Sequence, residues 1–595
     1  CAVLVSLFVS FSLDPMLSAY WPDPQLEAHE RRNPIARWLD RFNQWFDRQA
    51  DRYKGVIAWA LDHRALMLVI VAVSFVGAIV LQVLFGGAGF IPESDNSEIN
   101  LQVETPAGSN LEYTSIKARE ISAIAKSHPV VLYTYTAVGG SEGTGGAVDE
   151  GSIYVRLRPK ADRDVSQQEL ARQIRREIRR VGGVTAYLSE GGPGGNSKPL
   201  QIQIRGESMA ELQQAADRIA AEIAKVPGAT DIGLSNRGQK PELEVELNRG
   251  LAGSLGLTVG QVAQALRPAF AGIDAGDWVD PAGETRDVTV RLSPAARENV
   301  SDLAQLPLGL GLGAAGAAGL QGIGLTAPSV PSTVPLGQIA TIRRSVGPAE
   351  IEHLDRDRVI TVGANLEGRS LSEVSGDVNT RIRRMQLPPG VELSQGGEVE
   401  DQNDVFQKVF AALGLAVLLM YLILVVQFGS FLDPLAILLS LPLSLVGVVL
   451  ILLITGDTLN IMSLIGVILL MGIVAKNAIL LIDFAKWNHE GGMPLREALI
   501  EAGRVRLRPI IMTTMALIAG MIPVALGAGE GADFRAPLGR AVIGGTITST
   551  LLTLLVIPTM YEILVEWRQK VRGFFRRRSG IDVHRAAEAA GPANR

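Results

Sequence analysis

The feature of this 595-residue chain that most constrains its fold is a set of six long apolar runs. Each run is close to the length that an α-helix needs to cross the hydrocarbon core of a bilayer. The runs are Ala65–Phe85, Val409–Val426, Leu435–Thr455, Ile461–Ile482, Ile510–Leu526 and Ala541–Leu564. A partial run, Ala2–Leu13, opens the chain, and the polar block Gly86–Lys408 contains no spanning segment. We therefore predict an α-helical transmembrane bundle of six complete spans plus one partial span, with a large insertion outside the membrane.

The basic residues in the short flanking segments predict the orientation of the bundle. They gather before the first complete span, between the fourth and fifth, and after the sixth. These residues are Arg31, Arg32, Arg37, Arg41, Arg48, Arg52, Lys54 and Arg64, then Lys486, Arg496, Arg504, Arg506 and Arg508, then Arg568, Lys570, Arg572, Arg576, Arg577 and Arg578. If every span crosses once, all three segments fall on one side, and an excess of Lys and Arg marks that side as cytoplasmic. Gly86–Lys408 then lies outside the cytoplasm.

The outside block contains a repeated pattern of strand, helix and strand. Four Ser-x-x-Glu sequences predict helix starts with capping boxes: Ser109–Glu112, Ser166–Glu169, Ser208–Glu211 and Ser370–Glu373. Period-two alternation predicts strands at Glu98–Glu104, Ser152–Leu157, Leu200–Arg205 and Arg358–Leu366. Two consecutive βαβ units make a ferredoxin-like subdomain, so we predict an α+β insertion with two such subdomains.

The second predicted subdomain is interrupted at about Lys240–Val346. This segment has strand patterns at Glu242–Leu247 and Arg286–Leu292 and a helix pattern near Val259–Leu266. The Ala/Gly-rich stretch Gly309–Gly324 predicts a mobile surface loop, and a membrane-inserting hairpin is the alternative.

A second glycine-rich segment, Gly139–Gly146, joins two strands of the first subdomain. A phosphate-binding loop is not expected here, because no Lys-Ser/Thr follows and no helix starts at this point.

One basic residue interrupts the apolar stretch Leu464–Ile482. Lys476 lies near its middle, where a lysine costs roughly 2.5–3.5 kcal/mol on insertion scales. Such a charge is tolerated mainly where it faces a bundle interior and takes part in moving ions or substrate. The alternative is a lysine that extends to the cytosolic interface, about 10 Å away along the helix. We favour the functional interpretation, because a lysine side chain does not comfortably cover that distance.

Composition excludes several other classes of protein. The net charge of −5 argues against a nucleic-acid partner. The sequence contains no Gly-x-x-x-x-Gly-Lys-Ser/Thr loop, so an ATP-driven pump is not expected. The outside block has no ligand-spaced His/Cys/carboxylate cluster, so we expect neither an enzyme nor a metal site or cofactor. The single cysteine, Cys1, allows no internal disulfide. We expect a fragment that begins inside a transmembrane helix, with a lipoprotein-type acylated cysteine as the alternative.

Several motifs resemble one family of transporters. They are FVSFSLDPML (Phe8–Leu17), GFIPESDNSEINLQVETPAG (Gly89–Gly108), VVQFGSFLDPLAILLSLPLSLVG (Val425–Gly447), MGIVAKNAILLIDFAK (Met471–Lys486) and RVRLRPIIMTT (Arg504–Thr514). In this order the chain resembles the C-terminal half of resistance-nodulation-division (RND) efflux pumps of the hydrophobe/amphiphile branch. The resemblance implies a proton antiporter, and not an enzyme, in the inner membrane of a Gram-negative-type bacterium. It implies a multidrug pump, a homotrimer or heterotrimer that exports amphiphilic small molecules with a periplasmic membrane-fusion adaptor and an outer-membrane channel.

The resemblance also implies roles for single residues and boundaries for domains. Lys476 is similar to the family's proton-relay lysine, and Arg506 and Thr513 match the other relay positions of this half. For Arg506 an ordinary positive-inside arginine, and for Thr513 a hydrogen bond to its own helix, are the alternatives. Asp483, two turns beyond Lys476, lines the proton exit or is an interfacial cap.

The implied boundaries follow the spans and the repeat. They are 1–22, a truncated transmembrane helix; 23–64, a cytoplasmic linker with an amphipathic helix; 65–86, a transmembrane helix; 87–197, a periplasmic porter subdomain; 198–239 and 347–403, a second porter subdomain; 240–346, a docking-type insertion; 404–565, five transmembrane helices; and 566–595, a cytoplasmic tail.

Two departures from the family pattern matter. The family's paired aspartates belong to the N-terminal half, so this chain alone is not expected to transport. The region Gly139–Gly151, with the substrate-loop glycines Gly139, Gly140, Gly143, Gly145 and Gly146, takes the place of a phenylalanine-bearing switch loop. A heavy-metal exporter is one alternative, disfavoured because Met209 and Met385 are the only methionines of the block. A non-transporting assembly or sensor protein on a related fold is the other, and it predicts that Lys476 is dispensable.

Overall fold

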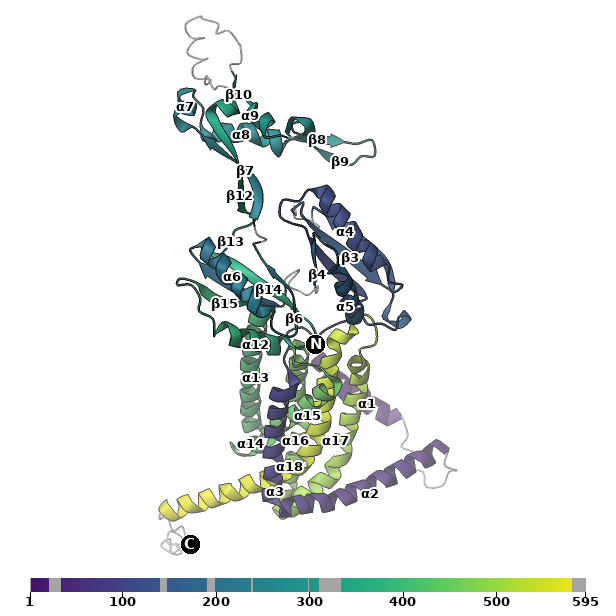
Figure 1. Ribbon diagram of the computed structural model, residues 1–595. Coiled ribbons are helices and arrows are strands. Elements are labelled where there is room, and N and C mark those ends of the chain that lie inside the picture. Colours follow the sequence, from purple (N-terminus) through teal and green to yellow (C-terminus); the bar gives the residue numbers. More distant parts are fainter. Residues whose placement is uncertain are drawn as a thin grey trace, which may run out of the picture.

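The computed structural model describes residues 2–20, 34–139, 147–189, 198–236, 239–297, 299–309 and 333–579. A bundle of long helices forms the lower part of the molecule in Figure 1, and two units that each contain a sheet and two helices lie above it. A third, extended unit rises beyond the second sheet. The chain enters and leaves the outside units through helices of the bundle.

Six helical segments are long and apolar enough to cross a membrane, which confirms the six complete spans. They contain α3 (Arg64–Leu81) with its π turn (Gln82–Gly86), α13 (Glu398–Phe428), α14 and α15 (Asp433–Leu438 and Ser440–Thr455), α16 (Ile461–Glu490), α17 (Leu495–Leu526) and α18 (Ala536–Ser579). α18 packs against α15, α16 and α17. At Gly447 and Gly544 the backbones of α15 and α18 meet so closely that a Cβ on Gly544 would lie 2.5 Å from the Gly447 carbonyl oxygen. Small residues allow such close approach between membrane helices.

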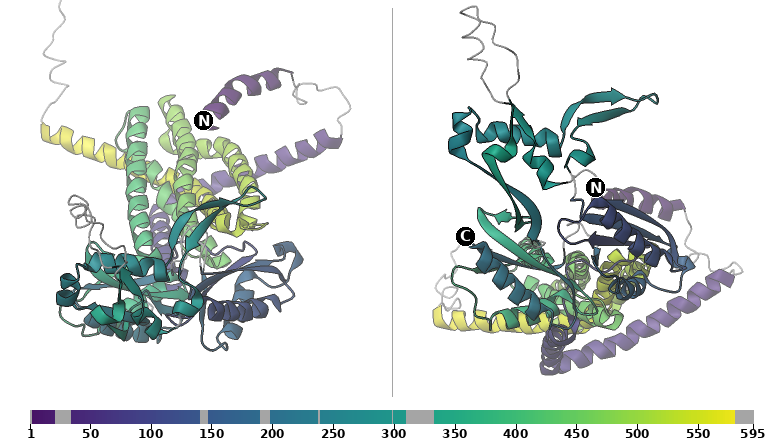
Figure 2. Two further views of the ribbon diagram at one scale, coloured as in Figure 1. Left: turned by 90° about the horizontal axis from the view of Figure 1, so that it is seen from above. Right: turned by 45° about the horizontal axis from the view of Figure 1, so that its top comes forward.

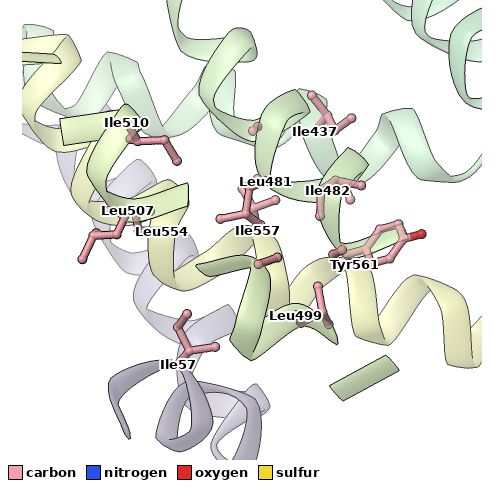
Figure 3. Packing of buried hydrophobic residues seen from close by; sticks show 14 of the residues in the cluster. Ile57, Ile437, Leu481, Ile482, Leu499, Leu507, Ile510, Leu554, Ile557 and Tyr561 are labelled. Atoms are coloured by element: carbon pink, nitrogen blue, oxygen red, sulfur yellow. The ribbon is translucent and has the colours of Figure 1, made fainter. Parts of the chain in front are cut away.

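The amphipathic helix α2 (Pro34–Asp62) passes beneath the bundle (Figure 1), and α1 (Ala2–Tyr20) lies apart from it (Figure 2). The Tyr53 hydroxyl on α2 donates a hydrogen bond of 2.6 Å to the Leu554 carbonyl on α18. Ile57 joins a buried cluster with Leu499, Leu507 and Ile557 from the spans (Figure 3). This cluster fixes α2 against the predicted cytosolic ends of α17 and α18.

The first sheet unit has the connectivity βαββαβ. Its elements are β1 (Glu98–Glu104), α4 (Leu111–Lys126), β2 (Val131–Val138), β3 (Glu150–Leu157), α5 (Gln167–Ile178) and β4 (Thr185–Ser189). The strand order is β2-β3-β1-β4 and every pairing is antiparallel. Ile99, Leu101 and Val103 point into the core as the period-two pattern predicts.

The second sheet unit repeats this connectivity around an insertion. Its elements are β5 (Leu200–Gly206), α6 (Met209–Ile223), β6 (Ala229–Leu234), β13 (Glu352–Leu354), β14 (Asp357–Leu366), α12 (Leu371–Ile382) and β15 (Glu392–Gly397). β14 pairs with β5, β6 and β13, and β5 also pairs with β15. The four strands that correspond to those of the first unit therefore have the same order. The predicted strands at Glu98–Glu104, Ser152–Leu157, Leu200–Arg205 and Arg358–Leu366 are confirmed.

The insertion begins and ends with β7 (Gln239–Leu247) and β12 (Ala340–Pro348), which pair antiparallel as a stalk. Its other elements are α7 (Arg249–Ser254), α8 (Val259–Phe270), β8 (Ile273–Val279), β9 (Thr285–Val290), α9 (Val300–Ala304), β10 (Pro307–Gly309), β11 (Thr333–Pro335) and α11 (Leu336–Ile339). The expected strand at Glu242–Leu247 and helix near Val259–Leu266 are confirmed, and the strand expected at Arg286–Leu292 is present but ends at Val290. Gly309 ends β10, and the rest of the Ala/Gly-rich stretch lies outside the described residues.

The capping boxes were only partly correct. Ser166 accepts a hydrogen bond from the Glu169 amide as expected, but α4 is capped by Asn110 and not by Ser109. Ser208 and Ser370 stand at the N-caps of α6 and α12 without a side-chain capping bond. The pattern therefore located the helix starts to within one residue, whereas neighbouring residues determine where each serine hydroxyl points.

Candidate functional site

Lys476 lies midway along α16, which begins at the Asn460 N-cap with a full capping box to Ser463. Its side chain is exposed, on a stripe of exposed residues that includes Leu469, Gly472 and Asp483. Within the described part of the chain the ammonium has no hydrogen-bond or ion-pair partner. The opposite face of α16 packs against α17 and α18. The lysine therefore lies at mid-span on a face of the bundle that the described residues leave uncovered.

Arg506 and Asp483 lie toward the end of the bundle where α2 packs. The Arg506 guanidinium lies over the ring of Phe484, 4.9 Å from its centroid, and its Nε is buried without a hydrogen-bond partner. Asp483, next to Phe484 in the sequence, is exposed on the Lys476 face. No ion pair joins Arg506 to Asp483 in the structure. The two residues are therefore near one level of the bundle but are not directly coupled.

Thr513 is exposed, and its hydroxyl donates a hydrogen bond of 3.0 Å to the Ile510 carbonyl of its own helix. This is the local bond that the sequence offered as the alternative to a relay role. In this conformation the structure does not bring Thr513 together with Lys476.

Sequence reasoning missed a line of hydroxyl groups inside the bundle. Thr546, Ser549, Thr550 and Thr553 are buried along one side of α18. The Thr550 Oγ1 lies 3.1 Å from the Thr514 Oγ1 of α17, and the Thr546 Oγ1 has no hydrogen-bond partner in the structure. The sequence signal was present, because Ser and Thr recur at helical spacing in the last apolar run.

Outside the membrane, a network of charged side chains joins the two sheet units. Arg175 of α5 is 8% exposed, and its guanidinium lies 3.0 Å from the Asp231 carboxylate and 2.6 Å from that of Glu367. Asn365 of β14 donates a hydrogen bond of 2.7 Å to the Leu188 carbonyl on β4. Buried ion pairs require such additional hydrogen bonds to offset desolvation. The network therefore fixes the two units edge to edge.

A cavity of about 610 Å³ lies beside this network, between β4 of the first unit and β6 of the second. Its walls include Glu104, Tyr187, Lys198 and Asp231. Burial lowers the pKa of the Lys198 ammonium, while the Glu104 and Asp231 carboxylates act to raise it. Burial also raises the pKa of the Tyr187 hydroxyl, which donates to Glu104. This volume falls in the range of sites for small molecules.

Of the glycine-rich loop, Gly139 alone lies within the described residues, where it follows β2 with φ +80°. Gly140, Gly143, Gly145 and Gly146 lie outside the described residues. Met209 and Met385, the two methionines of the outside block, pack against the hydrophobic core of the second unit. Among the described residues, no group of three or more His, Cys, Asp or Glu side chains is placed to hold a metal ion.

The sequence matches the AcrB/AcrD/AcrF family over residues 1–565. The chain belongs to this family. Similar solved structures include two crystal forms of a heavy metal efflux pump, each with a TM-score of 0.71 and 27% sequence identity. Each match covers 87% of this chain and 52% of the pump chain, so this chain spans about half the length of these pumps. The RND family assignment made from the sequence motifs is therefore confirmed.

Proposed function

We propose that this chain is the C-terminal half of an RND inner-membrane subunit that exports amphiphilic small molecules in exchange for protons. The observation that carries the proposal is the position of Lys476, at mid-span on the uncovered face of α16. A charge at that depth is costly unless another part of the protein supplies a partner. The N-terminal half of the pump, with a pair of aspartates, is the partner that we propose for this face.

The chemistry follows from the two protonation states of a carboxylate. An ammonium group stabilises an ionised carboxylate in a low-dielectric bundle and loses that attraction when the carboxylate binds a proton. Lys476 would then move relative to its partner with each proton. Asp483 and Arg506 would line the path toward the cytoplasm. Thr513 would exchange its bond to Ile510 for a bond to the switched form.

The outside units would carry the substrate. The two βαββαβ units have the element order of ferredoxin-like subdomains, and we assign them to a periplasmic porter region. The cavity between them would lie on the substrate path, with the loop of Gly139, Gly140, Gly143, Gly145 and Gly146 at the far end of β2. The insertion on the β7–β12 stalk would be the docking region. It would meet a periplasmic adaptor and an outer-membrane channel in a homotrimer or heterotrimer.

Export of a heavy metal is the second candidate, and the similarity to the heavy metal efflux pump favours it. A soft metal ion would need thiolate, thioether or imidazole ligands on its path. Met209 and Met385 instead pack in the core of the second unit. The polar and aromatic lining of the cavity therefore favours an organic substrate.

The test is drug susceptibility of a pump-deleted host that carries the full-length pump. Lys476→Ala should abolish resistance at normal expression and trimer assembly, because the carboxylates lose their switching partner. Lys476→Arg should fail as well, since a planar guanidinium does not replace a compact ammonium in a packed bundle. The matched control is Lys486→Ala on the same helix, whose ammonium donates to the Phe428 carbonyl and lies 5.6 Å from the centroid of the Phe428 ring. Normal resistance in the Lys476→Ala strain would contradict the proposal and favour a non-transporting assembly or sensor protein. If the Lys476→Ala strain keeps its drug resistance but loses metal tolerance, the result would favour the second candidate.

A further inference from the structure

The cavity between the two sheet units contains a lysine in an aromatic and acidic setting. The Lys198 Nζ lies 4.4 Å from the centroid of the Tyr187 ring, which is within the range of a cation–π interaction. The Tyr187 hydroxyl donates a hydrogen bond of 2.9 Å to Glu104 Oε1. Lys198 immediately precedes the second unit, whereas Tyr187 and Glu104 belong to the first. The ammonium therefore reaches across the cavity to the opposite wall.

The lysine side chain lies on a surface made by two glycines. Gly233 of β6 and Gly363 of β14 are directly paired in the sheet. A Cβ at Gly233 would lie 2.6 Å from the Lys198 Nζ, and a Cβ at Gly363 would lie 3.0 Å from its Cδ. Any larger residue at either position would push the lysine away. The two glycines thus leave the space that brings the ammonium over Tyr187.

Holding the Lys198 ammonium in this position costs free energy of hydration. Burial removes water from a strongly hydrated group, as the lowered pKa of Lys198 indicates. An organic cation whose charge is shielded by aromatic groups gives up less hydration on entering the same position. The cavity of about 610 Å³ leaves room for its apolar part.

We propose that Tyr187 and Glu104 form a subsite for the cationic group of a lipophilic organic cation, and that Lys198 occupies this subsite until the cation displaces it. The aromatic face and the carboxylate recognise a positive charge, and the lysine acts as an internal competitor. This inference rests on the proposed export function, because it names a substrate class for the same path. It further implies that the subsite would not increase the binding affinity of a neutral or anionic molecule of equal size.

The test is equilibrium dialysis of tetraphenylphosphonium against the full chain in nanodiscs of zwitterionic lipid. Tetraphenylborate is the probe of equal shape and opposite charge. Lys198→Met should raise the affinity for tetraphenylphosphonium about tenfold, because the internal competitor is gone. Glu104→Gln and Tyr187→Leu should each lower it about fivefold or more, whereas Tyr187→Phe keeps the aromatic face and should change it little. Lys225→Met, which removes an exposed lysine paired with Glu222, is the matched control and should have no effect.

A gain in affinity is a result that a misfolded cleft does not produce. Unchanged or weaker tetraphenylphosphonium binding in both Lys198→Met and Lys198→Gln would overturn the proposal. Loss of tetraphenylborate binding in these variants would also overturn it, and would make Lys198 an anion anchor. Binding is measured without a proton gradient. Loss of export with intact cation binding would therefore contradict the transport mechanism alone, and export without this binding pattern would contradict the subsite alone.

Discussion

Lys476 and Lys198 are both basic residues in places where a charge is costly, and the reasons for their positions differ. Lys476 lies on an uncovered face of a membrane span, without a partner among the described residues. Lys198 lies over the ring of Tyr187, and the carboxylates of Glu104 and Asp231 in the same chain act to raise its pKa. The first lysine therefore needs another part of the pump, whereas the second needs only the contact between the two sheet units.

The paired hydroxyls of Thr514 and Thr550 predict a measurable coupling energy between α17 and α18. Interhelical hydrogen bonds in membrane proteins contribute about 0.6 kcal/mol on average. A double-mutant cycle of Thr514→Val and Thr550→Val should therefore give a coupling energy of roughly 0.5–1.5 kcal/mol in detergent unfolding. Thr559→Val is the control, since its hydroxyl donates only to the Leu555 carbonyl of its own helix. A cycle that closes with no coupling would mean that the two hydroxyls do not stabilise the α17–α18 contact.

At the scale of elements, the fold could be predicted from the sequence where local patterns act alone. Apolar runs specified the six spans, and alternation specified strands such as Glu98–Glu104, because both signals depend on adjacent residues. Lys476 could be singled out for the same reason, since a charge in an apolar run is a local contrast. The ion network of Arg175, Asp231 and Glu367 left no such signal, because its three members lie far apart in the chain. The capping residues could be predicted only in part. The sequence pattern pointed to Ser109 at the start of α4, whereas Asn110 caps this helix.

The hairpin of β8 and β9 gives a prediction about pH. Two isolated strands are marginally stable, so the turn between them matters. Asp280 in this turn accepts hydrogen bonds from the amides of Ala282 and Glu284 and from the Arg286 side chain. These bonds, chiefly the one from Arg286, lower the pKa of Asp280 below its ordinary value. A lowered folded-state pKa stabilises the hairpin above the unfolded-state pKa, near 4, and this stabilisation is lost as the pH falls through the folded-state value.

The protection of the β8 and β9 amides against hydrogen exchange, measured relative to the intrinsic exchange rate at each pH, should therefore fall in Asp280→Asn at neutral pH, and in the unmodified chain only in acid. Asp287→Asn, an exposed carboxylate on β9, is the control and should leave exchange unchanged at neutral pH. Equal protection in the Asp280→Asn and unmodified chains would show that the turn does not order the hairpin.

At the scale of the whole molecule, the arrangement of helices and sheet units sets the orientation in the membrane. Both sheet units and the insertion lie at one end of the bundle, and α2 lies at the other (Figure 1). The basic segments gather at the α2 end, as the positive-inside pattern requires for a cytoplasmic side. The basic segments therefore all lie on the side that is predicted to be cytoplasmic.

Reporter fusions test this orientation. Fusions at Asp457 and within the β7–β12 stalk should be active as periplasmic reporters, and fusions at Trp487 and Arg572 as cytoplasmic ones. A cytoplasmic signal from the stalk would contradict both the orientation and the assignment of the sheet units to a porter region.

In the proposed mechanism Lys476 couples substrate export to proton movement, and proton flux measures this coupling most directly. The full-length pump is reconstituted in liposomes with an internal pH dye, and substrate is added under a proton gradient. The unmodified pump and the Lys486→Ala control should show substrate-dependent proton flux. Lys476→Ala should show none while still binding substrate, because only the carboxylate switch is lost. Proton flux in Lys476→Ala equal to that of the unmodified pump would contradict a coupling role for Lys476.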